Sequence, residues 1–441
     1  MRIHRLFWFG ALAIAVASGC DDGSDAASVV DQGMPDMAAD PYAAWPDPAT
    51  VFPAVYTPEE GLENWADVRW ETETWGPTDV EAGLYVRKLF QQRKGAPVES
   101  LAHFEAMNDA LPPLGDGITL AFGGDTLWVP DNWSAFATGA AGVLAADLRI
   151  GNLESVASAE HEVTREGLPV RFNMPPEVFD ALPFDVLQLN NNHTYDMDAA
   201  GVTSTKAGAE AAGYTTMGVD AQPIVTVGDK RVALMSFTWG LNRRDLEPQH
   251  DVFIVPFGHI GEDIDLSPIQ AQIDAARAEG VDHVVVVLHW GFEYEHFPDP
   301  HFMVLARRII AMGADVISAE GPHVVQPAEL CHVNQPEHVP GVGTCSIRTE
   351  DGVPRDAAVF YSLGNFSTEP DPAGTVYEVG IIGKVSLGDG GVTGMGWTPV
   401  TALHEPSRVE PLETNLDDAE RAAEHVRLQE HLGVGWFIPA P

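Results

Sequence analysis

The residues of this chain best suited to chemistry are carboxylates, amides and imidazoles that follow short apolar runs. The run at 186–189 is followed by three asparagines and His193, and Asp196 comes three residues later. Four further apolar runs end in the same manner, at Asp125, Glu154, His289 and His323. Oxygen and nitrogen ligands without thiolates suit Mn, Fe or Zn better than they suit a closed structural zinc site. The sequence therefore predicts a metal centre.

Such a centre would perform hydrolysis with the help of two ions. Two divalent ions about 3.5 to 4 Å apart clamp the attacking and leaving oxygens and lower the pKa of a bound water from about 15.7 toward 7. A carboxylate must bridge ions held so closely, and Glu154 or Asp125 could do so. A nearby histidine that binds no metal could protonate the departing alkoxide.

Each of these residues has an ordinary explanation when it is taken alone. Asp125 after two glycines could cap a helix, Asn191 could form an Asx turn, and Glu154 could belong to a surface ion pair. The metal interpretation depends on all of them ending predicted strands. The carboxyl ends of strands in an open α/β sheet meet at one edge, where side chains can converge on a ligand.

Strand-like and helix-like segments alternate from residue 117 onward, which predicts an α/β fold with a sheet covered by helices. Gly228-Asp229-Lys230 lies between two β-rich runs and indicates a hairpin, so we expect a mixed sheet. Late strands are expected at 357–362 and 376–387. The expected helices are 80–92, 98–111, 198–212, 267–279, 301–312 and 416–432.

The first twenty residues have the basic, apolar and small-residue regions of an export signal, and they end in Cys20 as a bacterial lipobox does. This pattern predicts removal of residues 1–19 and a lipid anchor on Cys20, on the periplasmic or cell-surface side of a bacterial membrane. An ordinary secretory peptide with an incidental Cys20 is the alternative. The rest of the chain divides into a flexible tether at 21–44, an N-terminal extension at 45–112, a main domain at 113–405, and a C-terminal helix and tail at 406–441.

The remaining cysteines, Cys331 and Cys345, lie in one stretch that contains proline and glycine. Because an exported chain meets an oxidising environment, we expect a disulfide between them. Two free buried thiols are the alternative.

The net charge of -41 argues against nucleic acid as a partner, because nucleic-acid affinity comes mainly from cationic side chains on phosphates. A polyanionic substrate would also be repelled at long range, although salt screens that repulsion beyond about 8 Å. Arg171, Arg243 and Arg244 are the candidate anion binders, since guanidinium groups suit carboxylate or phosphate oxygens. Ion pairing with surface acids is the alternative for each of them.

Eight short motifs occur in order along the main domain: Gly-Gly-Asp at 123–125, Asn-Leu-Glu at 152–154, Phe-Asn-Met-Pro-Pro-Glu at 172–177, Asn-Asn-His-Thr-Tyr-Asp at 191–196, Phe-Thr-Trp-Gly-Leu-Asn at 237–242, His-Trp-Gly-Phe-Glu-Tyr at 289–294, Gly-Pro-His-Val-Val-Gln-Pro at 321–327 and Tyr-Ser-Leu-Gly-Asn-Phe at 361–366. This order resembles the CapA family of capsule or poly-gamma-glutamate synthesis proteins, over about residues 117–403. That family belongs to the calcineurin-like metallophosphoesterase superfamily. The resemblance implies a layered sandwich of mixed sheets flanked by helices, with a two-metal site.

The resemblance also implies roles for individual residues. The implied metal ligands are Asp125, Glu154 as the bridging carboxylate, Asn192, His289 and His323. His193 would polarise the leaving group, and we count Asp196 in the same segment as catalytic with it. Glu293 and Tyr294 could orient His289, since metal-bound histidines commonly need such support.

One position departs from the family pattern. The family usually has a second histidine directly before the Pro-His of the late motif, and Gly321 stands there, preceded by Glu320. Glu320 could replace the imidazole as an oxygen ligand, which would favour a harder ion such as Mn. A centre with a single ion, or a degenerate centre, are the other interpretations.

Taken together, these patterns predict an exported, lipid-anchored hydrolase of the CapA type. Its substrate would be a phosphoester, an amide or a related bond in a cell-surface polymer, or a small anionic molecule. The alternative is a non-catalytic component that binds or exports an anionic polymer and keeps a degenerate metal site.

Overall fold

The computed structural model describes residues 98–441 except 167–169, 244–245, 247–250, 258–262 and 371–373. The described residues belong to the larger of two units, Pro41–Pro441. The export signal with Cys20, the tether, the expected helix at 80–92 and Arg244 lie outside them. No helix among the described residues combines the length and the apolar character that crossing a bilayer requires.

The first half of the main sheet is built around a group of parallel strands. The order β7-β6-β2-β1 is parallel throughout, and β16 and then β17 continue it in antiparallel fashion. The short strand β15 runs parallel to β1, and β18 pairs with β17. The strands are β1 Ile118–Thr126, β2 Leu148–Leu153, β6 Val186–Gln188, β7 Thr215–Met217, β15 Asn365–Ser367, β16 Val379–Gly388, β17 Gly391–Leu403 and β18 Arg408–Pro411.

The second half contains another parallel group, β9-β10-β11-β14, with β8 antiparallel to β9 at its edge. β12 pairs with β14, and β13 pairs with β12. Both halves belong to one fifteen-stranded sheet, which is joined where Asp356 of β14 pairs with Gly391 of β17. The strands are β8 Ile224–Val227, β9 Lys230–Thr238, β10 His283–His289, β11 Val316–Glu320, β12 Ala328–Val333, β13 Cys345–Ile347 and β14 Arg355–Phe360.

The sheet curls, so that β1 and β11 contact each other although they are not neighbours in the strand order. The predicted mixed α/β fold is therefore confirmed, and the predicted hairpin is the pair β8 and β9. A second, three-stranded sheet has the order β3-β5-β4. Its strands are β3 Val156–Ala157, β4 Thr164–Glu166 and β5 Arg171–Met174.

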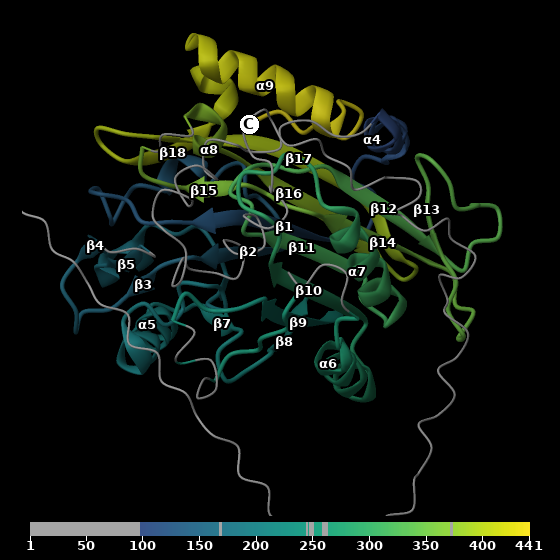
Figure 1. Cartoon of the computed structure of the whole chain (residues 1–441), viewed down its shortest axis with the longest axis horizontal. Coiled ribbons are helices and arrows are strands. Elements are labelled where there is room, and N and C mark those ends of the chain that lie inside the picture. The colour runs from purple at the N-terminus through teal and green to yellow at the C-terminus, as the bar shows by residue number, and fades with distance from the viewer. Residues whose placement is uncertain (1–97, 167–169, 244–245, 247–250, 258–262, 371–373) are drawn as a thin grey trace, which may run out of the picture. The chain divides into compact units, whose positions relative to one another are not determined.

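The helices lie close to their expected positions. Figure 1 shows α9 and α4 on one side of the strands and α5 and α6 on the other. Leu428 and Leu432 of α9 enter the same apolar core as Met395 and Trp397 of β17. The helices are α4 Val98–Ala110, α5 Asp198–Ala211, α6 Ser267–Ala278, α7 Pro300–Ala311, the single turn α8 Thr375–Glu378 and α9 Ala419–Leu432. Short 3-10 turns occupy Thr138–Ala140, Pro176–Asp180 and Leu412–Asn415.

The central strands explain why the polar residues gather at strand ends. Every residue of β10 is buried, and its sequence between the terminal histidines is Val-Val-Val-Val-Leu. A parallel strand covered on both faces is mostly apolar, so charged and imidazole side chains are favoured where the strand ends. His289 is the last residue of that strand.

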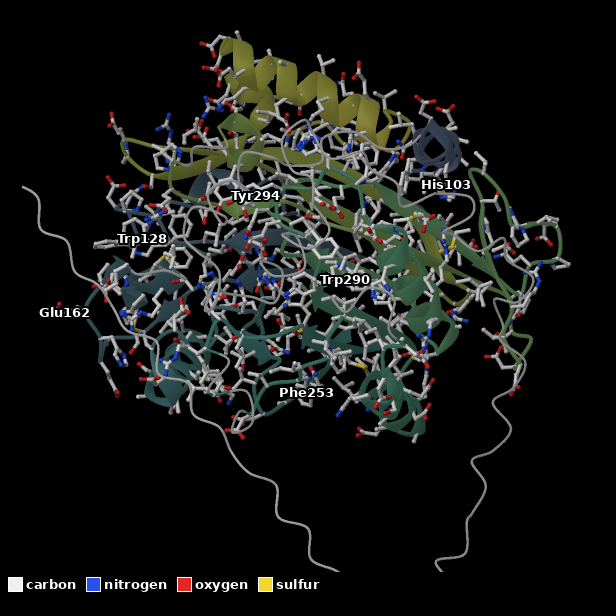
Figure 2. The ribbon with its side chains drawn as sticks, viewed as in Figure 1. His103, Trp128, Glu162, Phe253, Trp290 and Tyr294 are labelled. Carbon is white, nitrogen blue, oxygen red and sulfur yellow. A yellow bond between two sulfur atoms is a disulfide. The ribbon has the colours of Figure 1, made fainter. Side chains whose placement is uncertain are left out.

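A buried polar network attaches α4 to the main sheet. Glu329 of β12 accepts hydrogen bonds from Arg307 of α7 and from Tyr361, each at 2.6 Å, and lies 2.6 Å from His103 Nε2 of α4. Burial alone would raise the pKa of Glu329, but the charge of Arg307 and the hydrogen bond with His103 outweigh it and hold the pKa at about 2. Nearby, Cys331 and Cys345 form a disulfide bond. His103 is labelled in Figure 2.

We predict that Glu329→Gln destabilises the protein by about 3 to 5 kcal/mol at pH 7, because it removes the negative charge of a buried ion pair with Arg307. The folded-state pKa of Glu329 lies below its ordinary 4.5, so its ionisation stabilises the fold above pH 4.5 and this contribution disappears as the pH falls toward 2. The variant should therefore lose part of the acid dependence in that range. Urea unfolding at several pH values measures both effects.

Glu410→Gln is the matched control, since Glu410 forms a half-exposed pair with Arg408. It should change stability by less than about 1 kcal/mol. If Glu329→Gln lowers the free energy of unfolding no more than Glu410→Gln does, the buried network around Glu329 adds no stability beyond that of a surface ion pair.

Candidate metal centre

Two buried carboxylates lie at the centre of the site, at the carboxyl ends of adjacent parallel strands. Asp125 belongs to β1, and Glu154 follows β2 directly; both are wholly buried. Glu154 is fixed by its own N–H, which donates to the Thr126 carbonyl at 3.0 Å. The register between β1 and β2 shifts between Gly123 and Asp125, so β1 is irregular where its carboxylate enters the site.

Three histidines from separate segments approach these carboxylates. His289 Nε2 lies 3.4 Å from Glu154 Oε1, and His289 Nδ1 lies 3.8 Å from Asp125 Oδ1. His323 Nδ1 lies 3.1 Å from Asp125 Oδ2 and 3.8 Å from Glu154 Oε2. His193 Nε2 lies 3.9 Å from Glu154 Oε1. Folding therefore brings together residues that are far apart along the chain.

The chemistry of the cluster fits a cation. The ligand atoms of Asp125, Glu154 and His289 lie within 4.8 Å of one another. Among the described residues, no hydrogen-bond donor reaches either carboxylate oxygen of Glu154 or the buried Oδ1 of Asn192. Burial and then the charge of Asp125 raise the pKa of Glu154 well above its ordinary value, because the two acids repel each other. A bound ion would relieve both penalties.

The pKa values of His289 and His323 are shifted in opposite directions. Burial lowers the pKa of His289 to about 3, so its imidazole is neutral at physiological pH, as a metal ligand must be. Burial also acts to lower the pKa of His323, but its hydrogen bond to Asp125 and the charge of that residue raise it overall. His323 and Asp125 therefore form a close pair within the cluster, with 3.1 Å between His323 Nδ1 and Asp125 Oδ2.

His193 and Asp196 form a hydrogen-bonded pair beside the carboxylates. His193 Nδ1 lies 2.7 Å from Asp196 Oδ2, and the same oxygen accepts the Phe172 N–H at 2.7 Å. The Phe172 ring packs on the His193 ring with centroids 4.5 Å apart. Burial raises the pKa of Asp196 although both hydrogen bonds oppose that shift. With Nδ1 held by Asp196, the other ring nitrogen of His193 faces Glu154.

Comparison with models of known protein families finds a family that matches this chain. Residues 114–369 match the family of the bacterial capsule synthesis protein PGA_cap. The chain belongs to this family. The match covers every residue of the cluster described above, and it falls inside the main domain predicted at 113–405.

Curated relatives in the capsule synthesis family are similar over part of their length. The capsule biosynthesis protein CapA of Bacillus anthracis is 29% identical over 190 residues, which is 42% of this chain and 40% of that protein. The PGA biosynthesis protein CapA of Bacillus subtilis is 25% identical over 241 residues, 50% of this chain and 53% of the relative. A probable polyglutamine synthesis accessory protein of Mycobacterium tuberculosis is 27% identical over 206 residues, 42% of this chain and 52% of the relative. The chain thus spans about half the length of these relatives.

Two solved structures show a weaker similarity. A hypothetical protein from Thermus thermophilus has a TM-score of 0.36 and 14% identity, and the match covers 64% of this chain and 98% of that chain. The Thermus thermophilus sulfate thiohydrolase SoxB has a TM-score of 0.26 and 17% identity, covering 56% of this chain and 36% of that chain.

Gly321 stands where the sequence resemblance implied a histidine, and the local backbone suits a glycine. Gly321 has a φ of 112°, and a Cβ at this position would lie 2.6 Å from the Trp290 carbonyl oxygen. Its N–H instead donates to Asp125 Oδ2 at 3.1 Å. A side chain at residue 321 would therefore require the backbone to move.

Glu320 and Glu293 lie beside the cluster. Glu320 is buried and pairs in register with His289, and its Oε1 accepts a hydrogen bond from Ser318 at 3.2 Å. Burial and then the charge of Asp125 raise the pKa of Glu320 well above its ordinary value. Glu293 is half-buried, and its negative charge contributes to the raised pKa values of Glu154 and His323. Figure 2 labels the neighbouring residues Trp290 and Tyr294.

The two described arginines of the predicted anion-binding set pair with exposed acids. Arg171 donates to Glu166 at 2.9 Å, and Arg243 donates to Asp198 at 2.5 Å. The positive charge of Arg171 acts on the site indirectly, since it favours the ionised form of Asp196. Substrate binding by these arginines stays a prediction.

Sequence reasoning missed Asn152 and Asn365, which contact the cluster, and it gave Asn191 no role beyond a possible Asx turn. Asn152 donates to Asp125, Asn191 donates to Asn152, and Asn365 lies against His323. Asn152 and Asn191 stand in the motifs that carry Glu154 and His193, and Asn365 belongs to the Gly-Asn-Phe of the last motif. Their place in these motifs was the available signal.

We predict that Glu154→Gln stabilises the metal-free protein at pH 8, because the wild-type carboxylate must ionise there while it is buried beside Asp125. The folded-state pKa of Glu154 is raised, so its ionisation destabilises the fold increasingly as the pH rises above 4.5, and the difference between the proteins should vanish below that value. Unfolding in urea with chelator measures the effect. Added Mn²⁺ should stabilise the wild-type protein and not the variant. A variant less stable than wild type in chelator at pH 8 would contradict this electrostatic account.

Proposed function

We propose that this capsule synthesis family member is a metal-dependent hydrolase with a two-ion centre. The proposal depends chiefly on the environment of Glu154, whose wholly buried carboxylate receives no donated hydrogen bond from the described residues and faces Asp125 and three imidazoles. Burying ionised carboxylates together is costly unless a cation compensates them. A metal centre explains why the fold keeps this arrangement.

The residues that would hold the ions are Asp125, Glu154, Asn192, His289 and His323. Carboxylate, amide and neutral imidazole ligands suit Mn, Fe or Zn. Bound ions would supply an activated water and would neutralise charge that develops on the reacting oxygens. Glu154 lies close to both Asp125 and the histidines, so it is the best candidate to bridge two ions.

His193 would act as the acid for the departing group. Asp196 holds its Nδ1, which leaves Nε2 directed toward the carboxylates and available to donate a proton. The Phe172 ring and backbone limit the movement of both side chains. A proton donor held in this manner contributes typically 10² to 10⁴-fold to a rate.

The substrate we propose is a phosphoester, amide or related bond in the synthesis of a cell-surface polymer, or a small anionic molecule. The named functions of the relatives, capsule and PGA biosynthesis, support a polymer of the polyglutamate type. The protein would act on the exported side of a bacterial membrane, held by a lipid on Cys20. The disulfide between Cys331 and Cys345 supports an oxidising compartment.

A second candidate is a non-catalytic component that binds or exports the polymer. Gly321 favours it, because the backbone there offers no ligand side chain and its N–H already occupies an oxygen of Asp125. Polymer binding that survives complete removal of metal would support this candidate.

Metal analysis and hydrolysis assays on the mature chain test the proposal. We predict that wild-type protein retains transition metal and, with Mn²⁺, cleaves a generic phosphodiester or polyglutamate. Asp125→Ala should lose metal and activity together. His193→Ala should keep its metal but lose about 10² to 10⁴-fold in rate.

His332→Ala provides the control, since His332 is a half-buried histidine of β12 that pairs with Asp356 away from the cluster. It should retain both metal and activity. Absence of transition metal from wild-type protein grown in metal-replete medium would contradict the hydrolase proposal.

A further inference from the structure

We propose that Asn152 and Asn365 are positioning residues that orient Asp125 and His323 for metal binding. The inference rests on the proposed metal centre and adds two residues to it. Both amides are buried, and both touch candidate ligands without belonging to the candidate ligand set themselves.

The Asn152 amide is held so that its nitrogen faces Asp125. Its Nδ2 donates to Asp125 Oδ1 at 2.7 Å and lies 3.4 Å from His289 Nδ1. Its Oδ1 accepts from Asn191 Nδ2 at 2.9 Å. Reversing the amide would place its oxygen against a carboxylate and its nitrogen against another donor. Asn152 therefore has one favourable orientation, which directs a donor at Asp125.

Asn191 makes this arrangement rigid by connecting it to the next strand. Its Nδ2 also donates to the Leu153 carbonyl at 2.9 Å, and its Oδ1 accepts the His193 N–H at 3.0 Å. The hydrogen bonds thus run from Asp125 at the end of β1, through Asn152 of β2, to the segment after β6 that carries His193. A shift of any one of these strand ends would strain the others.

Asn365 has the opposite orientation, with its oxygen directed at an imidazole. Its Nδ2 donates to the Tyr377 carbonyl at 2.9 Å, so its Oδ1 faces His323 Nδ1 at 3.0 Å. The same ring nitrogen lies 3.1 Å from Asp125 Oδ2. The Asn365 amide oxygen and the Asp125 carboxylate thus flank one nitrogen of His323 and fix the ring beside the carboxylates. Hydrogen bonds from neighbouring oxygens commonly orient metal-binding histidines in this manner.

Zn²⁺ affinity, measured by competition with a chromophoric chelator, tests the inference. Asn152→Leu and Asn365→Leu should each weaken Zn²⁺ binding about 10 to 100-fold, while the number of ions bound at saturation stays the same. Asn108→Leu is the control, because Asn108 is equally buried but hydrogen-bonds to the His431 carbonyl in the contact between α4 and α9. It should alter the melting temperature and leave Zn²⁺ affinity unchanged.

Aspartate substitutions distinguish positioning from a general effect on folding. Asn365→Asp keeps an oxygen directed at His323 and should retain most of the wild-type affinity. Asn152→Asp loses the donor and sets a carboxylate against Asp125, so it should bind Zn²⁺ as weakly as Asn152→Leu. Leucine variants that match the control, or tighter binding by Asn152→Asp, would overturn the inference while leaving the metal centre intact. If the wild-type protein binds no Zn²⁺, this result contradicts the proposed metal-dependent function itself.

Discussion

The burial of Asp125 and Glu154 beside each other is the constraint on which the rest of this site depends. Each carboxylate is wholly enclosed, and the charge of Asp125 raises the pKa of Glu154 further than burial alone. Two buried like charges cost several kcal/mol unless cations or hydrogen-bond donors offset them. Asp125 receives donors from Asn152 and from Gly321, whereas Glu154 receives none from the described residues. A buried carboxylate without hydrogen-bond donors is what we expect at a site where a metal ion would bind and offset the negative charge.

Backbone segments lie so close together around the two carboxylates that some positions have room only for glycine. A Cβ on Gly124 would lie 1.8 Å from the Gly364 carbonyl oxygen, so β1 can approach the segment before β15 this closely only with a glycine at position 124. Gly321 has a comparable role, because its φ of 112° turns its N–H toward Asp125. These contacts bring the ends of β1, β11 and β15 together, and His323 and Asn365 then lie within reach of Asp125. Positions that carry no side chain thus shape the site as much as the ligands do.

Much of the architecture could be predicted because it depends on local pattern. The apolar run of β10 that ends in His289, and the hairpin at Gly228, are visible in the sequence and occur in the structure. The pairing of buried amides could not be predicted, since Asn365 and His323 are 42 positions apart and nothing local indicates their contact. Likewise, the sequence does not indicate whether Arg171 binds a substrate or pairs with an acidic side chain. The ion pair with Glu166 is visible only in the folded chain. The part that escaped prediction is therefore the geometry of polar side chains between distant segments.

The most direct test of the central claim is anomalous X-ray diffraction from crystals of the protein grown with Mn²⁺. The account predicts an anomalous peak between Asp125, Glu154 and His289, within about 2.0 to 2.3 Å of their ligand atoms. A second peak should share Glu154 with the first. A site that holds only water, or a lysine or arginine nitrogen against Glu154, would show that the buried carboxylates are balanced in another manner and would contradict the account.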